Sequence, residues 1–513
     1  MKNKLCKDLT FSECELTILR MAVDNAELKM GKRLVNTDEM KRIIDILEEF
    51  MRRKKTICYG GTAINALLPE EDQFYDKDIE IPDYDFFSSN ALKDAKELAD
   101  IYFKKGFTEV EAKSGQHHGT YKVFVNFIGI ADITQIPSQI FSVLQKDALK
   151  VNGIYYCPPN FLRMSMYLEL SRPAGDVSRW EKVLKRLILL NKHYPLTDLD
   201  CSKIEFQRSM KFNLNSKLKS KIKKNQQLIN EEKNEEKTNA GFNLNQNQVK
   251  LNNKLISAID YETLIANNVL NTLISNGTVF LGGYANALYS HYMPKNLRKK
   301  LENYADFEVL SNNPKTTIEL VSERLDDIGI KNLKIIYHKP IGELIPEHYE
   351  LKIQNNTILF VYKPIGCHSY NILKLNKKTI KVASIDTMLS FYLAFLYANE
   401  PHFNQYIDNL LCMSNFLFEV QQKNRLAQKG LLRRFSITCY GHQETLEEIK
   451  LEKAKKYEEL KKSGNKKLFE EWFLNYKPGN KKTKTKTKTK TKTKTKIKTK
   501  KQKLKTNVWE ILK

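Results

Sequence analysis

The feature that most constrains the fold of this chain is a cassette that occurs twice. Each copy reads as a short apolar strand, a Gly-Gly turn, a helix, and then a strand with two acidic residues near its start. The copies span 57–88 and 278–311; their glycine pairs lie 222 residues apart and their acidic pairs 223 apart. Because repeated units at a constant offset indicate duplication, the sequence predicts two related domains, each a sheet with flanking helices.

The first copy carries a pair of carboxylates that can bind a metal. Side chains alternate between the two faces of a strand, so we expect Asp83 and Asp85 on one face and Tyr84 and Phe86 on the other. Neighbouring carboxylates repel each other unless a cation lies between them. The pair therefore predicts a site for a divalent metal ion.

A glycine turn and a third carboxylate extend this predicted site. The backbone N–H groups of Gly60 and Gly61 can approach an anion closely, and a helix that starts at Thr62 adds a favourable dipole. Asp132 lies between apolar neighbours near the end of a stretch rich in β-branched and aromatic residues, which predicts strands. A buried carboxylate there needs a partner such as a shared metal ion. A simple cap at the end of the strand is the alternative.

These motifs resemble those of a known superfamily. The glycine pair, the paired aspartates and the third carboxylate are similar to the signature of polymerase β-type nucleotidyltransferases. More narrowly, residues 59–65, 82–88 and 171–180, which read YGGTAIN, PDYDFFS and SRPAGDVSRW, resemble the poly(A) polymerase catalytic subunits of large DNA viruses of the poxvirus and giant-virus type. The resemblance is strongest over residues 50–195 and weaker beyond them.

The resemblance implies a template-independent poly(A) polymerase, which transfers AMP from ATP to the 3′-hydroxyl of an mRNA and releases pyrophosphate. It implies that two Mg²⁺ (or Mn²⁺) ions bind Asp83, Asp85 and Asp132 and act on the attacking hydroxyl and the leaving group. The candidate nucleotide-binding residues are Gly60, Gly61, Thr62, Ser88, Arg179 and Lys182. The chain has no Gly-x-x-x-x-Gly-Lys-Ser/Thr motif, which disfavours a P-loop site.

A basic helix face follows the predicted catalytic sheet. Arg179, Lys182 and Arg186 are three and four residues apart, so they share one face of a helix. This face is a candidate for contact with the triphosphate or with the backbone of the RNA primer. A solvated basic face without a ligand is the alternative.

The second copy of the cassette differs where the chemistry requires acids. Glu308 replaces the second aspartate, and an alignment of the apolar stretches that follow places Ser369 where Asp132 lies. A longer side chain and one missing carboxylate make a poor site for two Mg²⁺ ions. We therefore expect a noncatalytic copy, which either shapes an RNA channel or serves as a scaffold.

Composition divides the chain into five parts, and the expected fold class is α+β (mixed α/β). A stretch dominated by Asn, Lys, Gln and Glu predicts a polar connection, and a Lys-Thr repeat lacks the apolar residues that a packed core needs. The expected parts are a catalytic nucleotidyltransferase domain with N-terminal helices at 1–200, a polar linker at 201–255, a degenerate nucleotidyltransferase-like domain at 256–400, a helical region at 401–478 and a disordered tail at 479–507.

Charge and cysteine content bear on partners and location. The net charge is +25, and the chain stays basic without the 14 lysines of 481–505, which favours an RNA partner. The eight cysteines have no metal-binding spacing, so we expect free thiols and no zinc site. No signal peptide or membrane span is predicted. We expect a soluble protein of a reducing compartment, and the resemblance implies the host cytoplasm or the virion.

Two other functions stay open. A related RNA terminal transferase with another nucleotide preference, such as UTP, would need the same carboxylates. A noncatalytic RNA-binding processivity subunit is the second alternative, and the intact set of three aspartates argues against it. Both a homodimer and a methyltransferase-type processivity partner are compatible with the resemblance.

Overall fold

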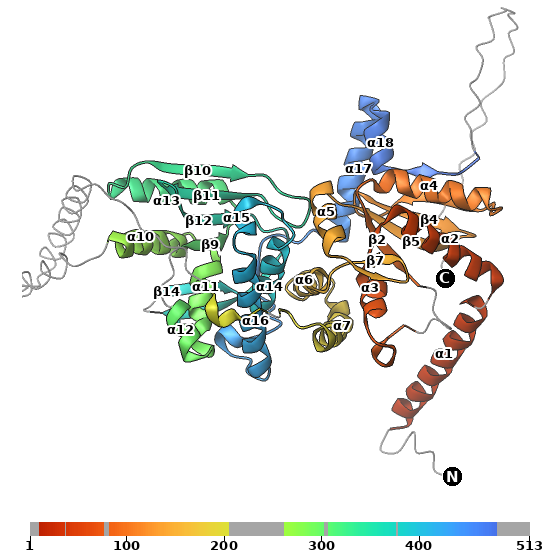
Figure 1. Cartoon of the computed structure of the whole chain (residues 1–513), viewed down its shortest axis with the longest axis horizontal. Coiled ribbons are helices and arrows are strands. Elements are labelled where there is room, and N and C mark those ends of the chain that lie inside the picture. Colours follow the sequence, from red (N-terminus) through yellow and green to blue (C-terminus); the bar gives the residue numbers. More distant parts are fainter. Residues whose placement is uncertain are drawn as a thin grey trace, which may run out of the picture.

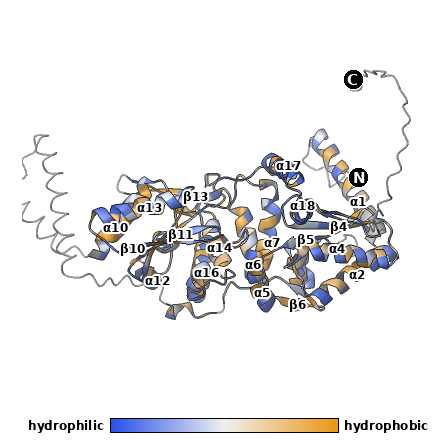
Figure 2. Cartoon of the chain, turned by 90° about the horizontal axis from the view of Figure 1, so that it is seen from above, coloured by the Kyte–Doolittle hydropathy of each residue, from blue (hydrophilic) through white to orange (hydrophobic). Residues whose placement is uncertain are grey.

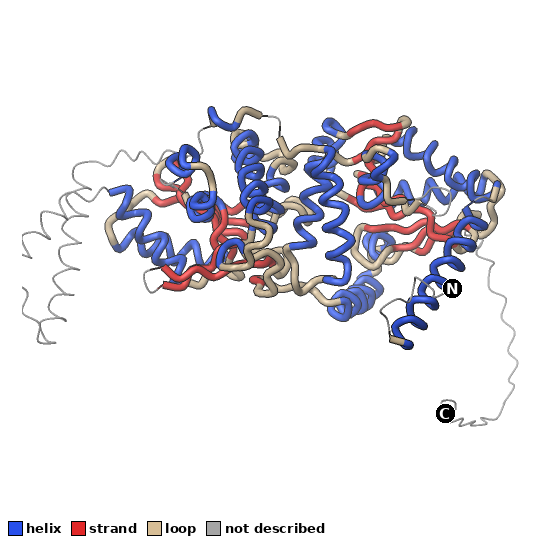
Figure 3. The backbone as a smooth tube through the Cα atoms, turned by 90° about the horizontal axis from the view of Figure 1, so that it is seen from below, coloured by secondary structure: helices blue, strands red, loops and turns tan. Residues whose placement is uncertain are grey.

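The computed structural model describes residues 10–35, 37–75, 82–197, 199–204, 261–301, 306–375 and 378–479. These residues form an elongated molecule with one sheet toward each end and helices between the two sheets (Figure 1 and Figure 3). Most of the predicted polar linker and nearly all of the predicted Lys/Thr-rich tail lie outside the described residues.

The first sheet contains the first copy of the cassette. Over the described residues it has eight strands in the order β16-β3-β4-β5-β2-β1-β7-β6. Neighbouring strands are antiparallel except for the parallel pairs β5–β2 and β1–β7. The strands are β1 (Ile57–Tyr59), β2 (Tyr84–Ser88), β3 (Val110–Ser114), β4 (Thr120–Val125), β5 (Ile128–Gln135), β6 (Leu149–Val151), β7 (Ile154–Tyr156) and β16 (Asn475–Tyr476).

Helices flank this sheet and connect its strands. Those of the first half are α1 (Phe11–Val35), α2 (Asp38–Lys54), α3 (Gly60–Leu67), α4 (Ala91–Lys104), α5 (Ser138–Asp147), α6 (Pro159–Leu170) and α7 (Trp180–His193). Helix α2 starts where the hydroxyl of Thr37 accepts a hydrogen bond from the N–H of Met40 at 3.2 Å. Its apolar residues, among them Ile43 and Phe50, recur at helical spacing and are buried against α4 and the sheet. The hydroxyl of Tyr102 in α4 donates to the carbonyl of Ile43 at 2.6 Å, which joins the two helices.

Helix α1 differs from α2 in how little of it is buried. The large apolar side chains described in its first half are exposed, with 63% of Leu16 and 59% of Leu19 accessible to solvent. The helix extends away from the body of the first half (Figure 1). Charged residues such as Glu15 and Arg20 interrupt its apolar positions, so the helix lacks the continuous apolar stripe that packing requires.

The second sheet contains the second copy of the cassette. Over the described residues it also has eight strands, in the order β10-β11-β12-β9-β8-β14-β13-β15. The strands are β8 (Val279–Leu281), β9 (Phe307–Leu310), β10 (Leu333–His338), β11 (His348–Ile353), β12 (Asn356–Tyr362), β13 (His368–Leu375), β14 (Lys378–Ala383) and β15 (Cys439–Tyr440).

The two sheets correspond strand for strand. The series β3-β4-β5-β2-β1-β7-β6 matches β10-β11-β12-β9-β8-β14-β13 in order and in the direction of every pair. In both sheets the parallel pairs are the third with the fourth strand of the series and the fifth with the sixth. The duplication predicted from the cassettes is therefore present in the topology, and the expected mixed α/β fold is confirmed.

The helices of the second half repeat this plan and meet the first half at the middle of the molecule. They are α10 (Tyr261–Ser275), α11 (Gly282–Tyr289), α12 (Lys295–Leu301), α13 (Pro314–Asp327), α14 (Ile385–Phe395), α15 (Pro401–Asn404) and α16 (Ile407–Lys423). Helix α14 packs against α6 and α16, and apolar residues gather on these helices (Figure 2). The rings of Phe161 and Tyr397 meet edge to face at 5.2 Å, and the N–H of Ser369 donates to the carbonyl of Ser171 at 2.8 Å. The two halves therefore share an apolar helical layer.

The C-terminal region contacts both sheets. Helices α17 (Leu446–Ser463) and α18 (Lys466–Trp472) return to the first half, beside β4 and β5 (Figure 1). Tyr121 donates its hydroxyl to the carbonyl of Glu471 at 2.9 Å, and β16 pairs with β3. In the second half β15 pairs with β13. A two-residue strand from the C-terminal region therefore extends each of the two sheets.

The cysteines also differ from the expectation of free thiols. The described residues include disulfides between Cys201 and Cys412 and between Cys367 and Cys439. Only Cys58 and Cys157 are free thiols in the described part of the chain, and both are buried. Separately, none of the described helices is long and apolar enough to span a membrane.

Candidate active site

Three aspartates come together where the parallel strands β2 and β5 lie side by side in the first sheet. Asp85 in β2 lies opposite Tyr59 of β1 on one side and opposite Asp132 of β5 on the other. Asp83 precedes β2 by one residue and is exposed. The hydroxyl of Tyr84 donates to Glu48 of α2 at 2.6 Å, so the alternation of β2 turns Asp85 to the face away from α2.

The glycine turn lies directly against these carboxylates. Gly60 has a φ of +71°, and a Cβ atom there would be 2.9 Å from Oδ2 of Asp85. Both the left-handed backbone and the close approach therefore require glycine. The hydroxyl of Thr62 donates to the carbonyl of Asp83 at 2.6 Å, which ties α3 to the start of β2. The first turn of α3 and the aspartates consequently form one unit.

The electrostatics of the cluster favour binding of a cation. Burial, and then the negative charges of Asp83 and Asp132, raise the pKa of Asp85 to about 7. Lys122, which neighbours Asp132 across the β4–β5 pair, forms an ion pair with it. One lysine does not neutralise three carboxylates. Because hard oxygen ligands are those that Mg²⁺ prefers, the side chains present fit a magnesium site.

A fixed guanidinium borders the glycine turn. Arg186 of α7 donates to the hydroxyl of Tyr75 at 2.6 Å, and its guanidinium lies over the ring of Phe74 at 4.8 Å. A Cβ atom on Gly61 would be 2.9 Å from both terminal nitrogens of Arg186. Arg186 therefore lies where a phosphate held by the turn would need a positive charge. The sequence predicts Arg186 on the same helix face as Arg179, seven residues away, but the candidate nucleotide-binding set does not include it.

The other two basic residues of this face are less enclosed. Arg179 forms an ion pair with Glu169 through its Nε at 3.0 Å, and more than half of its side chain is exposed. Its charge also lowers the pKa of Asp85, against the larger upward effects. Lys182 is exposed on the first turn of α7. Both residues lie on the side of the site that solvent and a long substrate can reach.

Ser88 is not part of this cluster. It lies at the opposite end of β2 from Asp85, and it is buried. Its hydroxyl donates to Asp94 of α4 at 2.6 Å and accepts a hydrogen bond from the N–H of Asn90 at 2.8 Å. These contacts position the start of α4, so the hydroxyl of Ser88 is directed away from the glycine turn, unlike the expected nucleotide-binding role.

The second copy has the same backbone conformation at its glycine turn but different acidic side chains beside it. The residue before the glycine pair has φ and ψ of −133° and −171° at Tyr59 and −132° and −168° at Leu281. Gly282 again has a positive φ, +64°, and a Cβ atom there would be 2.6 Å from Cδ of Glu308. The larger carboxylate thus occupies the space in front of the turn.

The register of β9 and β12 corrects the sequence alignment of the third carboxylate. Glu308 lies opposite Phe360, as Asp85 lies opposite Asp132. Ser369, which the alignment placed at this position, instead lies in β13, the counterpart of β6. A buried phenylalanine therefore replaces the third carboxylate.

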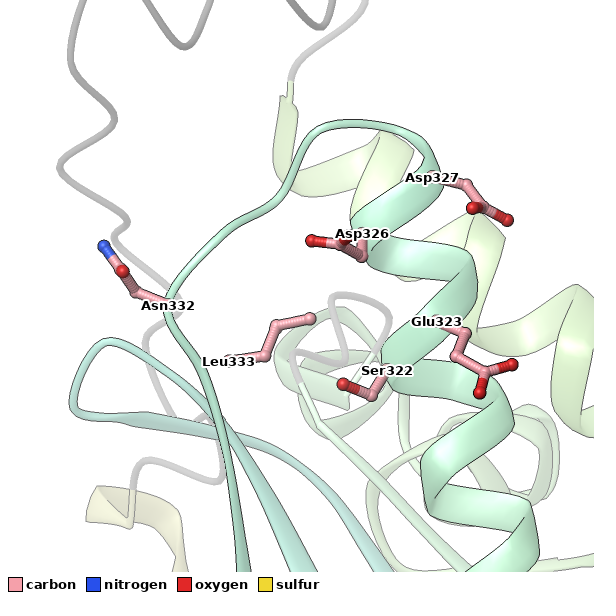
Figure 4. A pocket seen from close by; sticks show the side chains of 6 residues that line it. All are labelled: Ser322, Glu323, Asp326, Asp327, Asn332 and Leu333. Atoms are coloured by element: carbon pink, nitrogen blue, oxygen red, sulfur yellow. The ribbon is translucent and has the colours of Figure 1, made fainter.

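A separate hollow in the second half is unsuited to a nucleotide. Its volume is about 440 Å³, and it lies between α13 and the start of β10 (Figure 4). Three carboxylates at its wall would repel a triphosphate. The residues that line it are Ser322, Glu323, Asp326, Asp327, Asn332 and Leu333.

Comparison with known proteins agrees with the geometry of the first half. Residues 45–176 match the model of the family "Poly(A) polymerase catalytic subunit". The resemblance found in the motifs is thereby confirmed for this segment, which includes the glycine turn and all three aspartates.

Similar proteins occur in giant viruses and in African swine fever virus. A protein of Acanthamoeba polyphaga mimivirus that is named as a poly(A) polymerase catalytic subunit is 34% identical over 185 residues, which are 35% of this chain and 31% of that protein. A protein with the same name from the Badajoz 1971 strain of African swine fever virus is 34% identical over 180 residues, 34% of this chain and 38% of that protein. The chain thus matches about a third of the length of these relatives.

The similarity of the fold extends much further than that of the sequence. The crystal structure of the Megavirus polyadenylate synthase superposes with a TM-score of 0.65 and covers 90% of this chain and 84% of its own. The sequence identity is 21%, so this likeness concerns the fold. Both halves of the present chain therefore belong to one shared architecture.

Proposed function

We propose that this chain is a template-independent poly(A) polymerase, which transfers AMP from ATP to the 3′-hydroxyl of RNA. The observation that carries the proposal is the arrangement of Asp83, Asp85 and Asp132 beside a glycine turn that Arg186 borders. Carboxylates for metal ions next to a cradle for an anion suit nucleotidyl transfer. The match of residues 45–176 to the polymerase family supports adenylate as the group transferred.

The three aspartates would hold two Mg²⁺ ions. When bound, these ions lower the pKa of the attacking hydroxyl and stabilise the charge on the leaving pyrophosphate. The carboxylates must be ionised to bind them, and the pKa of about 7 at Asp85 makes binding sensitive to acid. Lys122 holds Asp132 in place through their ion pair.

The remaining residues orient the nucleotide. Without a Cβ atom at Gly60, the backbone of the turn can approach a phosphate, and the start of α3 directs its N–H groups toward it. Arg186 adds a guanidinium whose direction is set by Tyr75 and Phe74, so little freedom is lost when a phosphate binds. Gly61 and Thr62 complete the cradle. Arg179 and Lys182 stand at its exposed side, where they would contact the triphosphate or the RNA backbone.

The test is primer extension with each of the four nucleotides. Purified protein, Mg²⁺ and a labelled RNA primer are incubated with ATP, UTP, GTP or CTP alone, with the Asp85→Asn variant as a control for contaminating enzymes. We expect extension with ATP that exceeds the other three by at least tenfold. Equal or better use of UTP would replace the adenylate assignment by that of another terminal transferase. RNA binding without extension by any nucleotide would favour a noncatalytic processivity subunit.

The partners and the site of action follow from the proposed activity. RNA 3′ ends and ATP are the substrates, and action in the host cytoplasm or the virion matches the viral relatives. The processivity partner is either a second copy of the chain or a methyltransferase-type subunit. The mass of the purified protein in solution, measured together with the length of tail that it makes alone, distinguishes the two.

A further inference from the structure

Three histidines from two segments of the second half meet at one place. His338 ends β10, His348 begins β11 directly opposite it, and His402 lies in α15. One ring nitrogen of each lies within 4.8 Å of those of the other two. The rings of His338 and His348 stack at 4.6 Å, and that of His402 lies 4.7 Å from the ring of His338.

The rings of His338 and His348 each have one nitrogen hydrogen-bonded to an oxygen acceptor, as is common for histidines that bind metals. Nδ1 of His348 lies 3.0 Å from the carbonyl of Pro346, which makes Nδ1 the donor and leaves a lone pair on Nε2. Only 2% of His348 is exposed, and its buried Nε2 has no hydrogen-bond partner. Nε2 of His338 lies 3.0 Å from Glu350, which leaves the lone pair on its Nδ1. Histidines that bind metals donate their other N–H to a carbonyl or a carboxylate in this manner.

The partner of His338 is itself held in place. Glu350 is buried, accepts a hydrogen bond from Thr357 and forms an ion pair with Lys352 at 3.1 Å. The carboxylate therefore orients the ring of His338 through the N–H that it accepts.

We propose that His338, His348 and His402 bind one divalent transition-metal ion of the zinc class. Imidazole nitrogens select zinc and its neighbours rather than magnesium, so this site is chemically distinct from the aspartate cluster. Nitrogens bound to one zinc ion lie about 3.4 Å apart, so the stacked rings of His338 and His348 would have to turn about their side-chain bonds to direct their lone pairs at one ion. Three protein ligands leave the fourth position to water.

The ion would brace the surface on which the second half meets the first. The loop between His338 and His348 contains Gly342, and a Cβ atom there would be 3.1 Å from Pro137 of the first half. Just before α15, the carbonyl of Ala398 accepts a hydrogen bond from Gln139 at 2.7 Å. A metal that joins β10, β11 and α15 therefore holds both of these contact segments. This role does not depend on the proposed polymerase activity.

The test uses the full chain without a histidine tag. The protein is stripped with a chelator, dialysed, and loaded with Zn²⁺ or Co²⁺; bound metal is measured by mass spectrometry and the cobalt protein by its visible absorption. We expect one equivalent of metal, a visible band typical of low-coordinate Co²⁺, and a rise in Tm of roughly 5 °C at saturating Zn²⁺. Absence of bound metal together with an unchanged Tm would overturn the proposal.

Matched variants locate the site. His348→Gln and, because a buried substitution can prevent folding, the less buried His338→Asn should each lose the bound equivalent and the cobalt band. His442→Gln, which changes an exposed histidine far along the chain from the cluster, should keep both. Asp85→Asn should keep both as well, since it alters only the oxygen site. Equal loss in His442→Gln would assign the bound metal to a different place and refute the site.

Discussion

The two halves of this molecule have the same arrangement of strands and differ in the side chains beside the glycine turn. Both have the same strand order, the same strand directions and the same conformation before the glycine pair. In the first half Asp83 is exposed and Asp85 faces Asp132, whereas in the second half Asp306 is buried and Glu308 faces Phe360. The glycine turn is thus common to both halves, whereas the three neighbouring carboxylates of the proposed metal site occur in the first half alone among the described residues.

The largest expected difference between the halves is in activity. Asp85→Asn should lower the rate of primer extension by about 10³-fold or more, because it removes a central ligand of the metal ions. Glu308→Gln, the same change at the equivalent position, should leave the rate within about twofold of the unchanged protein. Steady-state extension by both variants measures this. Comparable losses would show that the second copy also acts in catalysis.

The second prediction concerns the stability of the second half. Phe360→Asp recreates the missing carboxylate inside an apolar core and should lower the free energy of unfolding by about 4 kcal/mol. Phe360→Leu keeps the site apolar and should cost about 1 kcal/mol. Urea denaturation compares them. A well-tolerated aspartate that gained metal binding would mean that the second copy has kept a usable site.

The third prediction concerns the guanidinium of Arg186 beside the glycine turn, which can be changed without altering the apolar core. Arg186→Gln should raise KM for ATP about tenfold, since a charged hydrogen bond to phosphate contributes on the order of 1.4 kcal/mol. Lys185→Gln changes the adjacent residue, which is exposed and pairs with Glu181, and should leave KM unchanged. If both variants behave alike, general positive charge rather than the position of Arg186 determines binding.

The last prediction concerns the dependence of stability on pH. Because the pKa of Asp85 rises to about 7 on folding, the metal-free folded protein holds this proton more tightly than the unfolded chain. Its stability should therefore fall as the pH rises from about 4 to 7, by about 2 kcal/mol for a side chain that is only partly buried. Urea midpoints at pH 5 and pH 8 in a chelator measure this loss. Added Mg²⁺ should offset it, and Asp85→Asn should remove it.

Much of the first half could be predicted from local patterns. Strand alternation placed Asp83 and Asp85 on one face, and the offset of the glycine pairs predicted the second sheet. The place of Phe360 could not be predicted, because two short apolar stretches align equally well in several registers and only strand pairing decides between them. The strands β15 and β16 are two residues long and have no pattern to detect.

Long-range contacts account for the other differences. The two disulfides join cysteines that are 211 and 72 residues apart, and the histidine cluster adds His402 to the neighbouring strands of His338 and His348, so no motif spacing indicates either feature. Ser88 belongs to a motif that resembles the polymerase family, yet its hydroxyl contacts Asp94 and Asn90 at the start of α4. Motif membership therefore identified the region of the site better than the role of each residue in it.

The pairing of β16 with β3 determines when the first sheet can be completed during translation. A ribosome has to translate the entire second half before Asn475 and Tyr476 exist, so β3 stays an open sheet edge for all of that time. Truncation before α17 would leave the same edge exposed, and with it a surface prone to pair with other strands. The three aspartates are translated before the second half, whereas the edge strand of the sheet that carries them is translated after it.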